Sequence, residues 1–243
     1  MPSVDANRGA KRAREARDAL GLDPAAPLAC LLTVVEERVG HSVVVTTLPG
    51  EIAGACFHLG DSAVLWVNGS RSQSRQRQRF TLAHELGHAW CRHDGTLEID
   101  TFATLNGRTS SPLEVQANAF AAEFLVPRAA LEQVITGQPT LEETVVIAAH
   151  FGVSAIMVVY RFKQLGLVSE HRATRLEAEI SEDRLHLDLH DRLGLDEFPD
   201  RLGAIERLPY LSPALEGTTL AAGVRGDAAV GSAVAGAIDR LLG

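Results

Sequence analysis

Two histidines four residues apart, with a glutamate directly after the first, are the residues of this chain best suited to chemistry. The segment 84–88 reads H-E-L-G-H, and on an α-helix residues i and i+4 project from the same face. His84 and His88, held side by side, could bind zinc, and Glu85 could accept a proton from water in an open zinc position. The pattern predicts a peptide hydrolase of the metalloprotease class.

The residues around this pattern favour a buried helix. Residues 77–83 carry apolar side chains that can face a core, whereas Gly87 costs about 1 kcal/mol relative to alanine in a helix interior. We expect Gly87 to permit close packing of another element behind the histidines. In the alternative interpretation, His84 and His88 are ordinary hydrogen-bonded histidines of a buried helix.

A catalytic zinc site needs a third protein ligand, and two patterns could supply it. The first continues from the helix as H-x-x-G-x-x-H, but Cys91 stands at the glycine position and Asp94 at the last position, with His93 one residue early. Asp94 and His93 are therefore weak candidates, and a solvated turn accounts for them equally well. Cys91 is more typical of a small packed residue than of a ligand or a redox-sensitive thiol.

The second pattern takes a glutamate from a separate helix over residues 112–126, which Ser111 can cap. Glu114 near the start of this helix is favoured as the ligand, and Glu123 near its end is the alternative. Asn118 follows Glu114 by one turn, so its side-chain oxygen could accept the N–H of a zinc-bound histidine and fix the tautomer.

Both motifs together resemble those of the ImmA/IrrE family of metallo-endopeptidases. The matching segments are R-Q-R-F-T-L-A-H-E-L-G-H at 77–88 and E-V-Q-A-N-A-F-A-A-E-F-L-V-P at 114–127, and the resemblance covers residues 25–168.

This resemblance implies a zinc protease of the gluzincin type, with one Zn²⁺ bound by His84, His88 and Glu114 and with Glu85 as general base. It also implies a protein substrate, a helix-turn-helix repressor whose cleavage derepresses its target genes.

Composition limits the alternatives. The chain has 243 residues, 46% of them hydrophobic and 22% charged, which is typical of a globular protein. Its net charge of −8 argues against direct nucleic-acid binding by the whole molecule. Three widely spaced cysteines favour a reducing cytoplasm over a disulfide framework. We expect neither a membrane span nor secretion, because no run of about 18 apolar residues and no apolar signal core is found.

We expect three parts: an N-terminal helical extension (1–24), the metallopeptidase domain (25–168) and a C-terminal region of unassigned role (169–243). Five basic residues at 8–17 invite a nucleic-acid interpretation, but a solvated or frayed terminal helix is preferred. The alanine-rich segment 228–242 predicts a helix that packs closely within the chain or on a partner.

The fold class expected for the domain is α+β, with a helical zinc-protease core and a small antiparallel three-stranded sheet. A helix at 28–39, ended by Gly40, precedes β-branched strands at 43–48, 52–58 and 63–68, which two hairpins would join. An edge of this sheet could bind the substrate backbone by strand addition.

Residues 94–111 are rich in Gly, Thr and Ser, which predicts a loop that borders the cleft as a lid or specificity element. A short helix is expected at 129–135. Thr140 and Glu143 have the spacing of a capping box, which starts a helix that runs to about residue 151.

That helix and the next one, at 155–165, resemble a DNA-binding helix-turn-helix. We interpret the pair as structural, because the second helix is mostly apolar and a recognition helix needs polar residues that reach base edges. His150 and Tyr160 are candidate oxyanion stabilisers, although core residues with a satisfied polar tip are the preferred interpretation.

Beyond residue 168 the resemblance ends and a helical region is expected, beginning at 171–182. Residues 185–191 alternate with period two, which predicts a polar strand, and their histidines and aspartates could alternatively bind a second metal.

Two functions compete: a cytoplasmic zinc endopeptidase, and a non-catalytic zinc-containing regulator that binds a repressor or DNA. Three protein ligands and a water favour catalysis, whereas four protein ligands favour a structural zinc. Manganese and cobalt are alternatives to zinc, because imidazole and carboxylate ligands suit all three ions.

Overall fold

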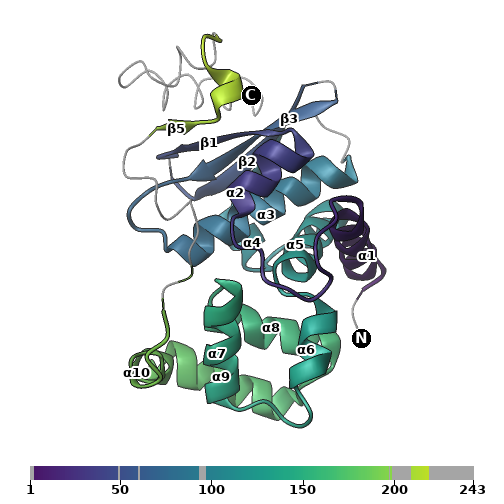
Figure 1. Cartoon of the computed structure of the whole chain (residues 1–243). Helices are drawn as coiled ribbons and strands as arrows, with labels where there is room; N and C mark the ends of the chain where they lie inside the picture. The colour runs from purple at the N-terminus through teal and green to yellow at the C-terminus, as the bar shows by residue number, and fades with distance from the viewer. Residues whose placement is uncertain are drawn as a thin grey trace.

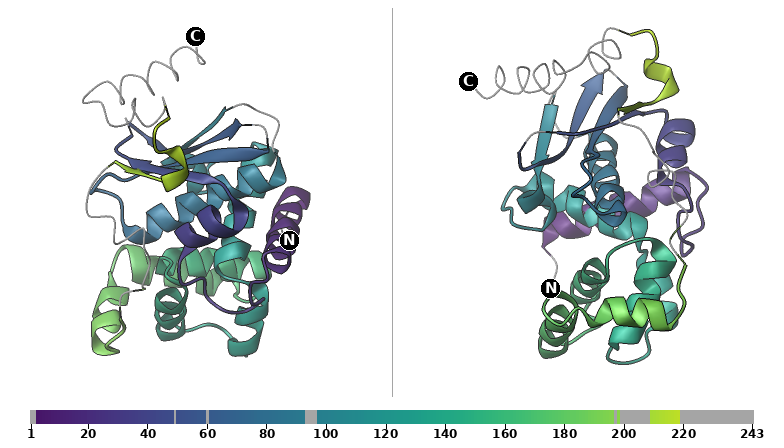
Figure 2. Two further views of the ribbon diagram at one scale, coloured as in Figure 1. Left: turned by 45° about the horizontal axis from the view of Figure 1, so that its top comes forward. Right: turned by 90° about the vertical axis from the view of Figure 1, so that its left-hand side faces the viewer.

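A five-stranded sheet and the helix with the H-E-x-x-H segment form one side of the molecule, and helices α6 to α10 form the other (Figures 1 and 2). The computed structural model describes residues 3–48, 50–59, 61–92, 97–196, 198 and 209–218. Its strands are β1 (Ser42–Thr46), β2 (Ile52–Leu59), β3 (Ser62–Asn68), β4 (Leu97–Thr101) and β5 (Tyr210–Leu211). Its helices are α1 (Val4–Ala19), α2 (Leu31–Thr33), η1 (Val34–Val39), α3 (Arg75–Cys91), α4 (Phe102–Leu105), α5 (Pro112–Leu125), α6 (Arg128–Val134), α7 (Leu141–Phe151), α8 (Ala155–Leu165), α9 (Glu170–Ser181), α10 (Leu185–Arg192) and η2 (Pro213–Leu215).

The α+β class is confirmed, but the sheet is larger than expected and mixed, with the strand order β4-β2-β3-β1-β5. The hairpin between β2 and β3 is present, whereas the expected hairpin between β1 and β2 is wrong, because β1 pairs with β3 in parallel. Residues 42–45 of β1 are all buried, which is typical of a central strand that needs a neighbour on each side. Strand β5, distant in sequence, supplies the second neighbour.

Part of the expected lid is regular structure rather than loop. Residues 97–101 form β4, an edge strand antiparallel to β2, and α4 follows at once. The register pairs Asp100 with Gly54 and Thr101 with Ile52, so β2 has one extra residue, Ala53, in a β-bulge. Bulges bend a strand and redirect side chains, and they are frequent next to active sites.

Helix α3 lies between the sheet and α5 and contacts β2, β3 and α5. Ser74 caps it by accepting the N–H of Arg77 at 3.2 Å. A β-carbon at Gly87 would lie 3.2 Å from the Cα of Ala117 and from the Cβ of Phe120, both in α5. The close packing expected behind the histidines is therefore confirmed.

Helix α1 packs on α5, so a solvated or frayed terminal helix is the wrong interpretation. Ala13 and Ala16 are fully buried, and Gly9 lies so close to α5 that a β-carbon there would clash with the carbonyl of Gln116. The buried Arg17 donates to the carbonyl oxygen of Phe124 at 2.6 Å. The other basic side chains of the helix pair with acids: Arg8 with Asp5, Lys11 and Arg12 with Glu15, and Arg14 with Glu123.

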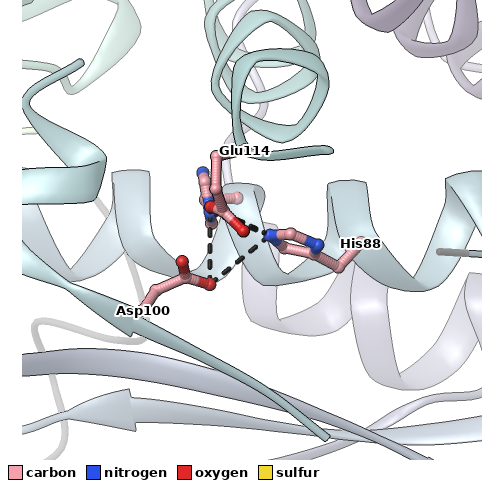
Figure 3. Close-up of side chains that lie close together, drawn as sticks. His88, Asp100 and Glu114 are labelled. Carbon is pink, nitrogen blue, oxygen red and sulfur yellow. Dashed lines mark hydrogen bonds and ion pairs between the residues drawn. The ribbon is translucent and has the colours of Figure 1, made fainter. Parts of the chain in front are cut away.

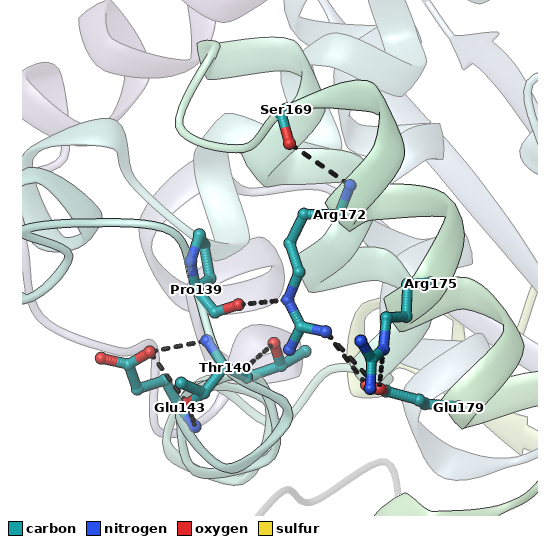
Figure 4. Close-up of polar contacts among 8 residues, drawn as sticks. Pro139, Thr140, Glu143, Ser169, Arg172, Arg175 and Glu179 are labelled. Atoms are coloured by element: carbon teal, nitrogen blue, oxygen red, sulfur yellow. Dashed lines mark hydrogen bonds and ion pairs between the residues drawn. The ribbon is translucent and has the colours of Figure 1, made fainter.

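Polar contacts cluster at the start of α7 and on the neighbouring α9 (Figure 4). The expected capping box is present: the Thr140 N–H donates to Glu143 Oε2 at 2.7 Å, and the Glu143 N–H donates to Thr140 Oγ1 at 3.1 Å. Arg172 of α9 donates from Nε to the carbonyl oxygen of Pro139 at 2.9 Å, and its Nη1 lies 3.4 Å from Glu179. The contact between Arg172 and Pro139 attaches α9 to the residue just before the N-cap of α7.

Two other expectations need correction. Residues 185–191 form the helix α10 rather than a strand, because they lie against α7 and α9, away from the sheet. The helix expected at 28–39 begins at Leu31 and continues as the π-helical η1 before Gly40, whose φ is 81°. Residues 228–242 lie outside the described residues, as do His93 and Asp94.

Among the described residues, no single helix has the length and apolar composition to cross a membrane. Helices α7 and α8 together meet that criterion as a pair, bent by 106° at the break between them.

Candidate metal centre

Side chains from three separate elements converge where α3, α5 and β4 meet (Figure 3). His84 and His88 come from α3, Glu114 from the first turn of α5, and Asp100 from β4. One ligand atom of each lies within 4.8 Å of those of the others. The histidines and Asp100 are buried, and Glu114 is nearly so.

The distances fit a single small cation. The His84 and His88 Nε2 atoms are 3.1 Å apart, and the Oε2 of Glu114 lies 3.2 and 3.5 Å from them. The Oδ2 of Asp100 lies 3.3 and 3.4 Å from the same two nitrogens. Ligand atoms about 2.0–2.1 Å from a tetrahedral zinc ion are about 3.3 Å from one another.

Asn118, which is itself held by the backbone of Thr104, orients the imidazole ring of His84. Its Nδ1 lies 3.1 Å from the Oδ1 of Asn118, whose Nδ2 donates to the carbonyl oxygen of Thr104 at 2.9 Å. Because the amide nitrogen of Asn118 is directed to that carbonyl, its oxygen is the acceptor and His84 Nδ1 carries the proton. The lone pair of His84 Nε2 therefore faces the other ligand atoms, as metal binding requires.

The two carboxylates of the cluster, Asp100 and Glu114, stabilise positive charge placed between them. Burial lowers the pKa of His84, but contact with Asp100 and Glu114 outweighs burial and raises the pKa to about 9. The pKa of His88 is likewise raised to about 9. Burial raises the pKa of Asp100, but the two histidines outweigh it and hold that pKa far below its usual range. Protons supply the positive charge in the metal-free protein, and a divalent cation can replace them.

Glu85 lies next to this cluster, fully buried in α3. Neither of its carboxyl oxygens has a hydrogen-bond partner among the described residues. Gly54 permits this position, because a β-carbon there would clash with Glu85 Oε1 and lie 2.6 Å from the Cγ2 of Thr81. Burial first, and then the charge of Asp100, raise the pKa of Glu85 well above its usual value. A buried, unpaired carboxyl group with a shifted pKa is a marker of function.

The alternative ligands lie apart from the cluster. Glu123 is buried in an ion pair with Arg161 of α8, and its Oε1 lies 3.5 Å from Arg14 of α1, so it links three helices. Cys91 is partly buried, and burial raises the pKa of its thiol to about 11. Among the described residues, no second group of metal-ligand side chains is found, so the alternative of a second metal in 185–191 gains no support.

A cavity of about 510 Å³ adjoins Asn118, the partner of His84, and neither the four ligand residues nor Glu85 line it. Asn118 lines it, as do Leu105, Met157 and Tyr160. Tyr160 is 47% exposed, so its expected place in the core is wrong. His150, the other candidate oxyanion stabiliser, is also exposed, lines a different cavity and has its ring centroid 4.8 Å from that of Phe151.

Asp100 is the residue that sequence reasoning missed. It lies in a segment assigned to a loop because of its Gly, Thr and Ser content. A signal was present in the alternation L-E-I-D-T at 97–101, which places Glu98 and Asp100 on one face of a strand.

Two histidines of an H-E-x-x-H helix lie with two carboxylates next to a sheet. This arrangement is typical of metal-dependent peptidases. Within this class, the chain belongs to the Peptidase_M78 family, described as the IrrE N-terminal-like domain, whose profile matches residues 37–163, more than half of the chain. The match includes α3, β4 and α5, and it confirms the resemblance to the ImmA/IrrE family. No curated protein gave a significant match.

Proposed function

We propose that the chain is a zinc-dependent endopeptidase whose substrate is a helix-turn-helix repressor, cleaved to derepress its target genes. The observation that carries the catalytic part is the convergence of His84, His88 and Glu114 beside the buried Glu85. The repressor as substrate is supported by the resemblance to the ImmA/IrrE family, in which such substrates are typical.

The residues of the centre divide the chemistry among them. When bound, zinc would supply Lewis acidity, which makes water nucleophilic near neutral pH and polarises a peptide carbonyl. His84, His88 and Glu114 would hold the ion, and Asn118 keeps His84 in the required tautomer. Glu85 takes the proton of the attacking water and delivers it to the leaving amine. Burial raises the pKa of Glu85, which makes its carboxylate a better proton acceptor than an exposed one.

The cavity beside the centre would bind a substrate side chain. Leu105, Met157 and Tyr160 give it an apolar wall, so an apolar residue next to the cleaved bond would be favoured. The polar Asn118 lines the same cavity and contacts His84, so it is the residue through which this cavity adjoins the metal centre.

The rival function is that of a non-catalytic regulator with a structural metal. The presence of Asp100 favours it, because four protein ligands are typical of structural zinc sites. Glu85 favours catalysis, because a structural site gains nothing from a buried, unpaired carboxyl group that costs about 1–3 kcal/mol. A neutral residue at position 85 would avoid this cost, so we propose that the metal centre is catalytic.

The test is the metal content of the purified chain, together with cleavage of a helix-turn-helix repressor and of unfolded casein. We expect the wild type to carry about one zinc ion and to cleave at least the repressor. Glu114→Ala should lose the metal and the activity together. A wild type that binds no transition metal when zinc is supplied would contradict the proposal. A metal-loaded wild type that cleaves neither protein would support the regulator instead.

A further inference from the structure

We infer that Asp100 is a fourth protein ligand that closes the metal centre and holds the enzyme latent until an incoming peptide displaces its carboxylate. This inference rests on the proposed function, because it concerns the same metal centre.

Asp100 lies as close to the two histidine nitrogens as Glu114 does. Its Oδ2 lies 3.3 and 3.4 Å from the two imidazole Nε2 atoms, compared with 3.2 and 3.5 Å for the Oε2 of Glu114. The Asp100 side chain is also the more buried of the two, at 2% exposed compared with 13%. Five of the six distances among the four ligand atoms are 3.1–3.5 Å, as in a closed, four-coordinate site, and the sixth, between Asp100 and Glu114, is within 4.8 Å.

The chain holds Asp100 in this position. The β-bulge at Ala53 lies beside the partner of Asp100 in β2 and redirects the strands at that point. The next residue, Thr101, caps α4 by accepting the N–H of Thr104 at 3.2 Å. The carbonyl oxygen of Thr104 in turn accepts from Asn118, the partner of His84. Residues 101–104 therefore link the backbone next to Asp100 to Asn118, the residue that orients His84.

The same position can be vacated. Strand β4 is at the edge of the sheet and pairs with β2 alone among the described strands, so fewer hydrogen bonds hold it than hold a central strand. A rotation of the Asp100 side chain, or a shift of β4, would open one coordination position while His84, His88 and Glu114 keep the metal.

Charge explains why ligation by Asp100 would suppress activity. A divalent ion held by two neutral imidazoles and one carboxylate has a net charge of +1, which polarises a carbonyl and acidifies water. A second carboxylate makes the site neutral and takes the position that water or substrate needs. Glu85 would then have no proton to take.

The experiment uses the full chain loaded with cobalt in place of zinc, because the visible spectrum of Co²⁺ reports its ligands. Wild type is compared with Asp100→Asn and Asp100→Ala, and acetohydroxamate is added as a small competing ligand. Glu98→Gln is the matched control, because Glu98 lies on the same face of β4 but outside the cluster.

We expect both Asp100 variants to retain cobalt with an altered spectrum and an affinity weakened about tenfold or more. They should bind acetohydroxamate at concentrations that leave wild type and Glu98→Gln unchanged. With zinc, Asp100→Asn should cleave casein faster than wild type does. Asn is nearly isosteric with Asp, so this variant remains informative if Asp100→Ala fails to fold.

The outcomes separate this inference from the proposed function. Asp100 variants with the wild-type cobalt spectrum and hydroxamate response would overturn the inference and leave the peptidase proposal intact. An altered spectrum with slower cleavage would overturn latency, because Asp100 would then be needed for turnover. A wild type that binds no cobalt would overturn both proposals.

Discussion

Glu85 is the residue at which catalysis and structure can be told apart. Exchange Glu85→Gln removes the proton acceptor but leaves all four candidate metal ligands in place. We expect cleavage to fall by about 10²- to 10⁴-fold, the usual contribution of a general base. Metal content should stay at the wild-type level, and thermal stability should not fall, because the amide carries no charge to bury. Activity assays and metal analysis of the same preparation check both parts, and loss of metal would contradict the assigned role.

The histidines make metal binding dependent on pH. In the metal-free protein the pKa values of His84 and His88 are about 9, so at pH 7 they hold protons that a metal ion must displace. Metal affinity should therefore rise as pH increases from 7 to 9, by about tenfold per pH unit for each proton released, and should level off above 9.

Calorimetric titration with zinc at pH 7, in two buffers of different protonation enthalpy, measures the protons released. We expect between one and two per metal ion. A binding enthalpy that is the same in both buffers would show that the histidines are already neutral, contrary to the raised pKa values.

The place of Asp100 in the cluster could not be predicted from the sequence, unlike that of the other residues. The histidines, Glu85 and Glu114 could be proposed because their spacing within helices follows from helix periodicity. The position of Asp100 depends on the pairing of β4 with β2 across more than 40 residues, and no local pattern encodes that pairing.

At the scale of elements, Glu123 has a structural role rather than a ligand role. It is buried with Arg161 and joins α5 to α8, so Glu123→Ala would leave a buried guanidinium without its charged partner. Breaking such a pair costs about 3–5 kcal/mol. We expect a large loss of thermal stability, with metal content unchanged in the folded fraction, in contrast to Glu114→Ala.

The matched control is Glu132→Ala in α6. Glu132 is half-exposed and accepts from Arg128 at 2.8 Å, and exposed pairs of this kind contribute about 0–1 kcal/mol. If Glu123→Ala were no more destabilising than this control, the buried ion pair would not be holding the helices together.

Two segments with the same alternating pattern show why the elements were only partly predictable. Residues 97–101 form a strand, whereas residues 185–191 form a helix, although both alternate leucine or isoleucine with polar residues. The first segment has the edge of β2 beside it, and the second lies against α7 and α9. Capping boxes and the β2–β3 hairpin depend on nearby residues and were predicted, whereas the pairing of β1 with β3 and of β4 with β2 depends on distant residues and was not.

At the scale of the molecule, the metal centre and the cavity that Asn118 lines involve different parts of the chain. The ligands come from α3, β4 and α5, whereas Met157 and Tyr160 of the cavity wall belong to α8, among the helices α6 to α10 (Figures 1 and 2). The cavity therefore depends on how the helical side is placed against α3 and α5. The buried pair of Glu123 and Arg161 joins α5 to α8 at this contact.

Tyr160 tests whether this cavity binds substrate. Because its side chain is 47% exposed, Tyr160→Ala should leave stability nearly unchanged while removing part of the apolar wall. Loss of about 1.4 kcal/mol of contact with a substrate side chain would lower kcat/KM about tenfold, mainly through KM.

The control for that change is Tyr160→Phe, which keeps the ring and removes only the hydroxyl. Wild-type kinetics for Tyr160→Phe, with a raised KM for Tyr160→Ala, would support an apolar subsite formed by the helical side. Equal losses in both variants, seen in kcat rather than KM, would instead show that the hydroxyl stabilises the oxyanion, because only a transition-state contact lowers kcat without affecting binding. Steady-state kinetics on one peptide substrate distinguish the two roles.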